Sequence, residues 1–149
     1  MPIKRLVMVC ILIMILFGIS AAGCLGVKTP PVSKPAPPAV FVDYHRSGGV
    51  EGTDDRLVIF DNGAAVVATK TVSTEIILNE TEIAGIASLF DKAQFSQFQT
   101  NYPAPRGSSN MYHYSISYKG KTITVDESAY HPSLQPVING LDKIIHARK

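Results

Sequence analysis

The sequence has no tryptophan, only two cysteines and 8% aromatic residues, so a folded core must be built mainly from aliphatic side chains. Lysine and arginine total 14 against 12 aspartates and glutamates, and no basic run interleaved with aromatic residues is present. Proteins that bind nucleic acid carry such basic patches, so we expect no nucleic-acid partner.

Motifs of enzymes and metal sites are also missing. There is no Gly-x-Ser-x-Gly elbow, and the glycine-rich residues 47–52 lack the lysine of a phosphate-binding loop. Glu51, Asp54 and Asp55 carry oxygen ligands, but their spacing is not that of a calcium loop. No histidine has a second ligand at a metal-binding spacing; the four are His45, His113, His131 and His146. We predict a non-enzyme without cofactor or metal, with an enzyme of unknown class as a distant alternative.

The first 24 residues have the pattern of a secretory signal. Lys4 and Arg5 precede residues 6–19, which are apolar apart from Gly18. This apolar run is shorter than the roughly 20 residues of a membrane span. The following Ala21-Ala22-Gly23-Cys24 resembles the lipobox of prokaryotic lipoproteins. The resemblance implies cleavage after residue 23 and lipidation of Cys24, with an uncleaved single-pass anchor or full secretion as alternatives.

Cleavage there changes the composition of the mature chain. Cys10 leaves with the signal, so Cys24 has no cysteine to pair with. Residues 24–39 contain Pro30, Pro31, Pro35, Pro37 and Pro38, which favour an extended polyproline spacer. We therefore predict a signal peptide at 1–23, a lipid-anchor cysteine and linker at 24–39, and one domain at 40–149 on the outer face of the cell membrane.

The domain is predicted to be α+β. Strands are expected over residues 40–46, 56–61, 64–72, 111–119 and 121–126, with the third strand extending toward residue 77. Helices are expected to begin after Asn79 and at Pro132, and residues 101–110 to form a loop. The order βββαββα predicts an antiparallel sheet of about five strands with both helices on one face.

Asn79 has two interpretations. It can cap the helix that follows, because Glu82 three residues later completes a capping-box pair. Asn79-Glu80-Thr81 also matches the acceptor pattern for N-glycosylation, which the expected location permits.

Alternation along residues 111–119 divides their side chains between two faces of a strand. Tyr112, Tyr114, Ile116 and Tyr118 are expected to face the core. The opposite face is then polar, in solvent or in an interface, and consists of His113, Ser115, Ser117 and Lys119.

A strand ending in Arg-Ser-Gly-Gly, followed by an apolar residue and another glycine, resembles the beginning of the emfourins, small protein inhibitors of thermolysin-like metalloproteases. The resemblance implies a contact loop that enters a protease cleft. This candidate loop consists of Arg46, Ser47, Gly48, Gly49, Val50, Glu51 and Gly52. A tight turn that needs positive φ accounts for the same glycines.

The sequence therefore supports two functional hypotheses. The first is a membrane-anchored, non-catalytic domain that binds a protein or peptide, with protease inhibition as its sharpest form. The second is a structural lipoprotein that pairs with a cell-envelope protein through its polar strand face or a sheet edge.

Overall fold

The computed structural model describes residues 36–106 and 110–147. The expected signal peptide, Cys24 and most of the proline-rich linker lie outside the described residues. Along the part of the chain that the structure describes, no helix combines the length and apolar character needed to cross a membrane.

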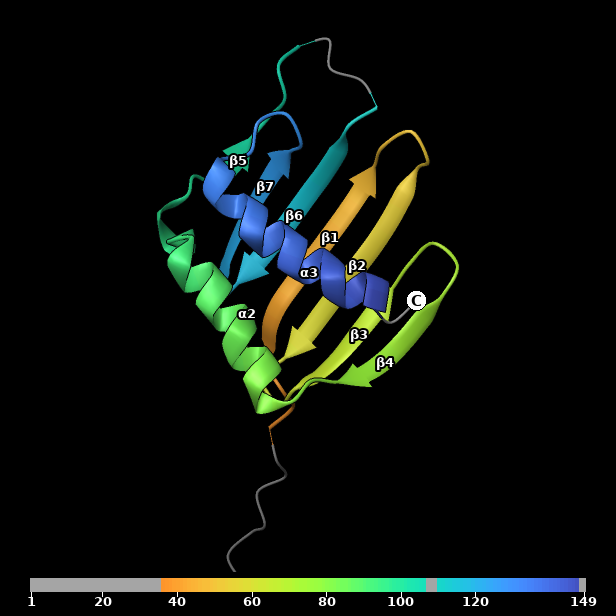
Figure 1. Ribbon diagram of the computed structural model, residues 1–149, viewed down its shortest axis with the longest axis vertical. Coiled ribbons are helices and arrows are strands. Elements are labelled where there is room, and N and C mark those ends of the chain that lie inside the picture. The colour runs from red at the N-terminus through yellow and green to blue at the C-terminus, as the bar shows by residue number, and fades with distance from the viewer. Residues whose placement is uncertain (1–35, 107–109, 148–149) are drawn as a thin grey trace, which may run out of the picture. The chain divides into compact units, whose positions relative to one another are not determined.

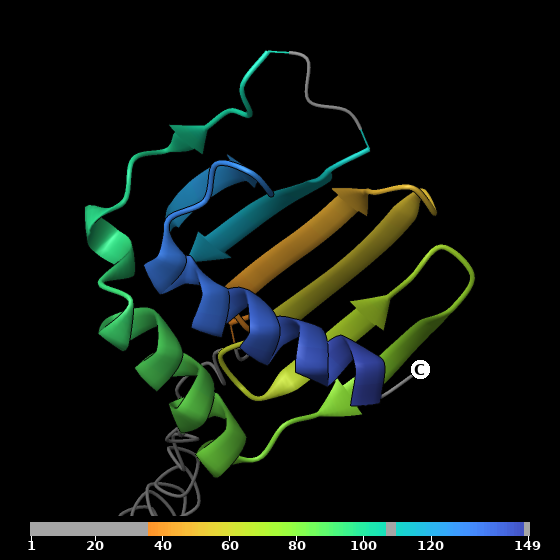
Figure 2. The same cartoon turned by 45° about the horizontal axis from the view of Figure 1, so that its top comes forward.

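The described residues form an α+β fold with one mixed sheet of seven strands in the order β4-β3-β2-β1-β6-β7-β5. The strands are β1 (Val40–Gly48), β2 (Thr53–Phe60), β3 (Ala64–Ala68), β4 (Ser73–Ile77), β5 (Asn101–Tyr102), β6 (Tyr112–Tyr118) and β7 (Lys121–Asp126). The helices are α2 (Glu80–Lys92) and α3 (Gln135–Ala147), with short 3₁₀ turns at Phe95–Gln97 and Pro132–Leu134. Both long helices lie on the same face of the sheet (Figures 1 and 2).

Two strands differ from the sequence prediction of about five antiparallel strands. The expected third strand ends at Ala68, and β4 returns antiparallel to it as the edge of the sheet. A turn separates the two, in which Thr69 N–H donates to Val72 O at 2.7 Å. At the other edge, the expected loop contains β5, which pairs parallel with β7. The sheet is therefore mixed.

Helix α2 begins as predicted. Asn79 Oδ1 accepts from Glu82 N–H at 2.9 Å, and Glu82 Oε2 accepts from Asn79 N–H at 2.8 Å. This reciprocal capping box is present and satisfies donors that have no partner within the helix. Glycosylation of Asn79 stays a prediction.

The core fills the space between the sheet and the two helices. Aromatic rings form its centre, where Phe90 of α2 stacks on Tyr118 at 4.1 Å between ring centroids. Aliphatic side chains of α3 complete it, namely Val137, Ile138, Leu141 and Ile145. The core is thus mainly aliphatic with a small aromatic cluster.

The other face of the sheet is open. Residues 113, 115 and 117 are exposed or half-buried, while Tyr114, Ile116 and Tyr118 are buried, as the alternation predicts. Alternation along residues 40–44 predicts that Val40, Val42 and Tyr44 share the buried face, and this prediction is wrong for Val40. A register shift between Val40 and Val42 leaves Val40 53% exposed, whereas Val42 and Tyr44 are buried.

Candidate functional site

The turn between β1 and β2 is short and tightly held. Strand β1 continues through Gly48 and β2 begins at Thr53, so only residues 49–52 connect them. Gly49 N–H donates to Met111 O at 3.0 Å, and Gly52 N–H donates to Gly49 O at 3.2 Å. Val50, at the tip, is 85% exposed. The turn therefore presents one apolar side chain on a fixed backbone.

The predicted contact loop is divided by the structure. Val50, Glu51 and Gly52 are exposed, whereas Arg46 and Ser47 belong to β1 and are half-buried. Because side chains alternate along a strand, these two point to opposite faces. Arg46 points toward α3, and Ser47 lies on the open face beside His45 and His113.

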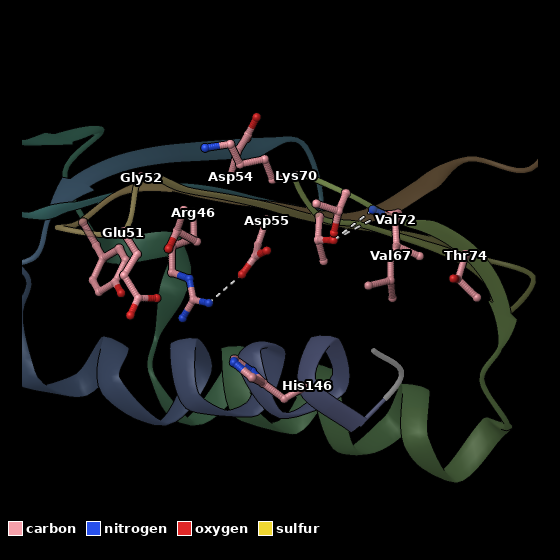
Figure 3. Close-up of a pocket in the computed structure, with 14 residues that line it drawn as sticks. Arg46, Glu51, Gly52, Asp54, Asp55, Val67, Lys70, Val72, Thr74 and His146 are labelled. Atoms are coloured by element: carbon pink, nitrogen blue, oxygen red, sulfur yellow. Dashed lines mark hydrogen bonds and ion pairs between the residues drawn. The ribbon is translucent and has the colours of Figure 1, made fainter.

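Arg46 ties the base of the turn to the rest of the fold. Its Nη2 donates to Asp55 Oδ2 at 2.6 Å, and its Nη1 donates to Asp142 Oδ2 at 2.8 Å. The Tyr44 hydroxyl donates to the other oxygen of Asp142 at 2.7 Å. Asp55 is only 3% exposed, so the pair is buried at that end. These bonds join β1, β2 and α3. Figure 3 shows the bond between Arg46 and Asp55.

The raised pKa values of Arg46 and Tyr44 keep both side chains in the protonated form that donates these hydrogen bonds. Burial lowers the pKa of Arg46, but the hydrogen bond to Asp55 and the charge of Asp142 outweigh it, and the pKa is raised. Burial, together with the charge of Asp142, raises the pKa of Tyr44 far above its ordinary value. Tyr44 thus remains a donor and Arg46 a cation throughout the physiological range.

Tyr112 supports the turn from β6. Its ring lies 5.2 Å from the Arg46 guanidinium carbon, measured to the ring centroid. A Cβ atom on Gly49 would lie 2.6 Å from Tyr112 Cε1, so only glycine lets this ring approach the turn. The turn is therefore fixed by packing as well as by hydrogen bonds.

Beside the turn lies a cavity of about 450 Å³. Glu51 and Gly52 border it on one side, and the β3–β4 turn borders it on the other. Arg46 and Asp55 lie between the sheet and α3, and His146 projects toward them from the helix (Figure 3). Val72, on the β3–β4 turn, is 54% exposed. Two hairpin turns with exposed valines thus flank one hollow.

No local sequence pattern identifies Asp142, Asp55 and Tyr44 as partners of Arg46. One signal was available, since Arg46 continues the alternation of the buried residues Val42 and Tyr44. A charged residue on a buried face requires a partner of opposite charge. Nothing in the sequence shows that the partner is Asp142, which lies 96 residues away.

The open face carries two histidine–carboxylate pairs. His45 Nε2 contacts Asp54 Oδ1 at 2.7 Å, and His113 Nδ1 contacts Asp126 Oδ1. The pKa of Asp126 is lowered, first by the hydrogen bond that Ala104 N–H donates to its Oδ2 and also by His113. Asp126 is therefore a carboxylate at neutral pH.

Within residues 36–106 and 110–147, no group of three or more histidine, cysteine, aspartate or glutamate side chains is arranged to hold a metal ion.

No protein-family model matches the chain, and no curated protein matches it either.

Proposed function

We propose that this chain is a membrane-anchored, extracytoplasmic lipoprotein whose small domain binds a protein through its β1–β2 turn. The anchor part of the proposal rests on the signal-like residues 1–19 and on Cys24 after them. Measuring the mass of the N-terminal peptide tests it, since lipidation adds acyl chains to a new N-terminal Cys24.

The observation that carries the binding part is the exposure of Val50 on a rigid turn. An apolar side chain at the tip of a hairpin has no role in the core. Because the Arg46 ion pairs and Gly49 fix the backbone, little conformational entropy is lost when a partner covers Val50. Such pre-organisation is typical of protein inhibitors, whose interface backbone moves little on binding.

Inhibition of a thermolysin-like metalloprotease is the sharpest form of the proposal, because residues 46–52 resemble the emfourins. We expect the detergent-solubilised full chain to slow such a protease. Val50→Asp is expected to weaken inhibition about 10-fold or more, because a charge would be buried against the protease. The assay is a titration of protease activity with the chain.

Val72→Asp is the matched control, since Val72 is also an exposed valine on a hairpin turn. It is expected to inhibit like the wild type. Full protease activity at high concentrations of the chain would remove the inhibitor form of the proposal. Equal losses in both variants would mean that Val50 has no special role.

A structural lipoprotein of the envelope is the second candidate, and one feature of the sheet edge favours it. Strand β4 is an edge strand, and its Ile77 is 75% exposed. Ile77 borders a second hollow of about 450 Å³, lined also by Phe60 and Val66. An edge strand beside apolar side chains can pair with a strand of another protein. A partner that crosslinks at Ile77 and not at Val50 would support this candidate.

A further inference from the structure

Three residues with the chemistry of a catalytic triad occupy one row across the open face of the sheet. Strand pairing places Ser47 of β1 opposite His113 of β6, and His113 opposite Asp126 of β7. Directly opposed residues on antiparallel strands have Cβ atoms about 4.5 to 5.5 Å apart. The sheet therefore brings a hydroxyl, an imidazole and a carboxylate together in the order that nucleophilic catalysis requires.

The orientation of the His113 ring fits the order of hydroxyl, imidazole and carboxylate across the three strands. Since Asp126 is a carboxylate, it can only accept, so His113 Nδ1 donates to it and Nε2 is the ring nitrogen left for Ser47. The opposite edge of the ring faces β1, where His113 Cδ2 would lie 3.3 Å from a Cβ atom on Gly48. Glycine at position 48 thus makes room for the imidazole beside Ser47.

Neither the Ser47 hydroxyl nor His113 Nε2 has a hydrogen-bond partner among the described residues. No hydrogen bond joins the two groups in this structure, so the reactive arrangement requires side-chain rotation. Serine rotamers on an open sheet face change on the picosecond to nanosecond scale, and catalytic hydrogen bonds are often formed only with substrate bound.

We propose that Ser47 is a nucleophile that is acylated by small carboxylic esters with good leaving groups, with His113 as its base and Asp126 as a positioning residue. This activity goes beyond the proposed binding function and uses the opposite face of β1 from Arg46. Neither Ser47 nor His113 lines any of the hollows described above, which favours small, activated esters as substrates.

The reaction is an acyl transfer followed by hydrolysis. Ser47 Oγ attacks the carbonyl carbon, and its proton passes to His113 Nε2. The bond from the carbonyl carbon to the leaving oxygen breaks, and the alcohol departs with that proton. Water then attacks the acyl-serine by the same route, so that one ester and one water give one acid and one alcohol. His113 is 60% exposed, and stabilisation of the oxyanion by water makes this reaction slow.

A second serine on the same face provides an internal comparison. Ser115 of β6 lies opposite His45 of β1. In that pair Nε2 of His45 is already bound to Asp54 at 2.7 Å. His45 therefore has its Nε2 occupied by a carboxylate, whereas the Nε2 of His113 is not. Ser47 and Ser115 thus differ in the one feature that the proposal requires.

Labelling of the full chain with a fluorophosphonate probe tests the proposal. In that reaction a bond forms between Ser47 Oγ and phosphorus, the phosphorus–fluorine bond breaks, and fluoride leaves as His113 takes the proton. Mass spectrometry is expected to find one adduct, on Ser47, in the folded chain and none in the urea-unfolded chain. Ser47→Ala is expected to abolish the adduct, and Ser115→Ala to label like the wild type.

His113→Ala is expected to slow labelling about 100-fold or more, in the range that a general base contributes. Added imidazole is expected to restore part of the rate, which a purely structural role of His113 would not allow. Asp126→Asn is expected to slow labelling, and Asp126→Glu to recover part of it. Circular dichroism verifies that each variant is folded. Absence of an adduct, an adduct on another residue, or wild-type labelling of His113→Ala would overturn the proposal.

Discussion

Arg46→Ala is expected to lower the free energy of unfolding by about 3 to 5 kcal/mol, the range observed when one partner of a buried ion pair is removed. The substitution leaves Asp55, which is 3% exposed, without the guanidinium at 2.6 Å. It also removes the guanidinium at 2.8 Å from Asp142, whose other oxygen accepts from Tyr44. Both carboxylates then lose the cation that each contacts.

Arg56→Ala is the matched control. Arg56 makes a two-bond ion pair with Asp43 at 2.7 and 3.0 Å, so the number of bonds lost is comparable. Its side chain is 56% exposed, however, and surface ion pairs contribute about 0 to 1 kcal/mol. Urea denaturation of both variants measures the difference. Equal losses of stability would show that the ion pairs of Arg46 with Asp55 and Asp142 contribute no more than a surface ion pair.

Gly48→Ala is expected to destabilise the fold more than Gly120→Ala. Both glycines have positive φ, at 93° and 81°, so an alanine costs about 1 to 2 kcal/mol of backbone strain at each. At Gly120 a Cβ atom meets nothing within 4 Å, whereas at Gly48 it would lie 2.5 Å from Met111 O. A clash with backbone on the neighbouring strand adds about 1 to 3 kcal/mol.

Thermal unfolding of the two alanine variants measures this difference. Equal midpoints would mean that β1 can move away from Met111 at no cost. The clash at Gly48 also limits the variants that can test binding. A larger residue there, such as valine in Gly48→Val, would disturb β1 itself. A loss of inhibition by that variant would therefore not separate misfolding from a lost contact with the protease. Val50→Asp changes only an exposed side chain and avoids this ambiguity.

The elements predicted from the sequence were those whose signals are local. The capping box of Asn79 and Glu82 lies within four residues, and it places the start of α2 correctly. The alternation of β6 assigns its two faces without any knowledge of the partner strands. Local hydrogen bonding and side-chain alternation therefore determine these elements almost independently of the rest of the chain.

The missed elements have weak local signals. The turn between β3 and β4 contains neither glycine nor proline, and its β-branched residues are typical of strand, so the sequence predicts one long strand there. Hydrogen bonds between Thr69 and Val72, including Val72 N–H to Thr69 Oγ1 at 3.2 Å, close the turn instead. Strand β5 has two residues and exists only because it pairs with β7.

The functional residues divide in the same way. The sequence predicts a contact loop over Arg46 to Gly52 from its glycines and its resemblance to a known loop, and within that loop the structure exposes Val50 to Gly52. Helix placement determines the ion pair between Arg46 and Asp142. Strand register determines the row of Ser47, His113 and Asp126. Such long-range juxtapositions follow from the assembled sheet, and no local sequence pattern encodes them.

In the proposed function, the tip of the β1–β2 turn contacts a protein partner. The most direct measurement replaces Val50, and separately Ile77, with a photo-crosslinking amino acid in the full chain in intact cells. We expect one discrete protein adduct from position 50 that is absent from position 77, and we expect this adduct to be lost when Glu51 and Gly52 are replaced in the same chain. A discrete adduct from position 77 with none from position 50 would contradict the claim and place the contact at the β4 edge.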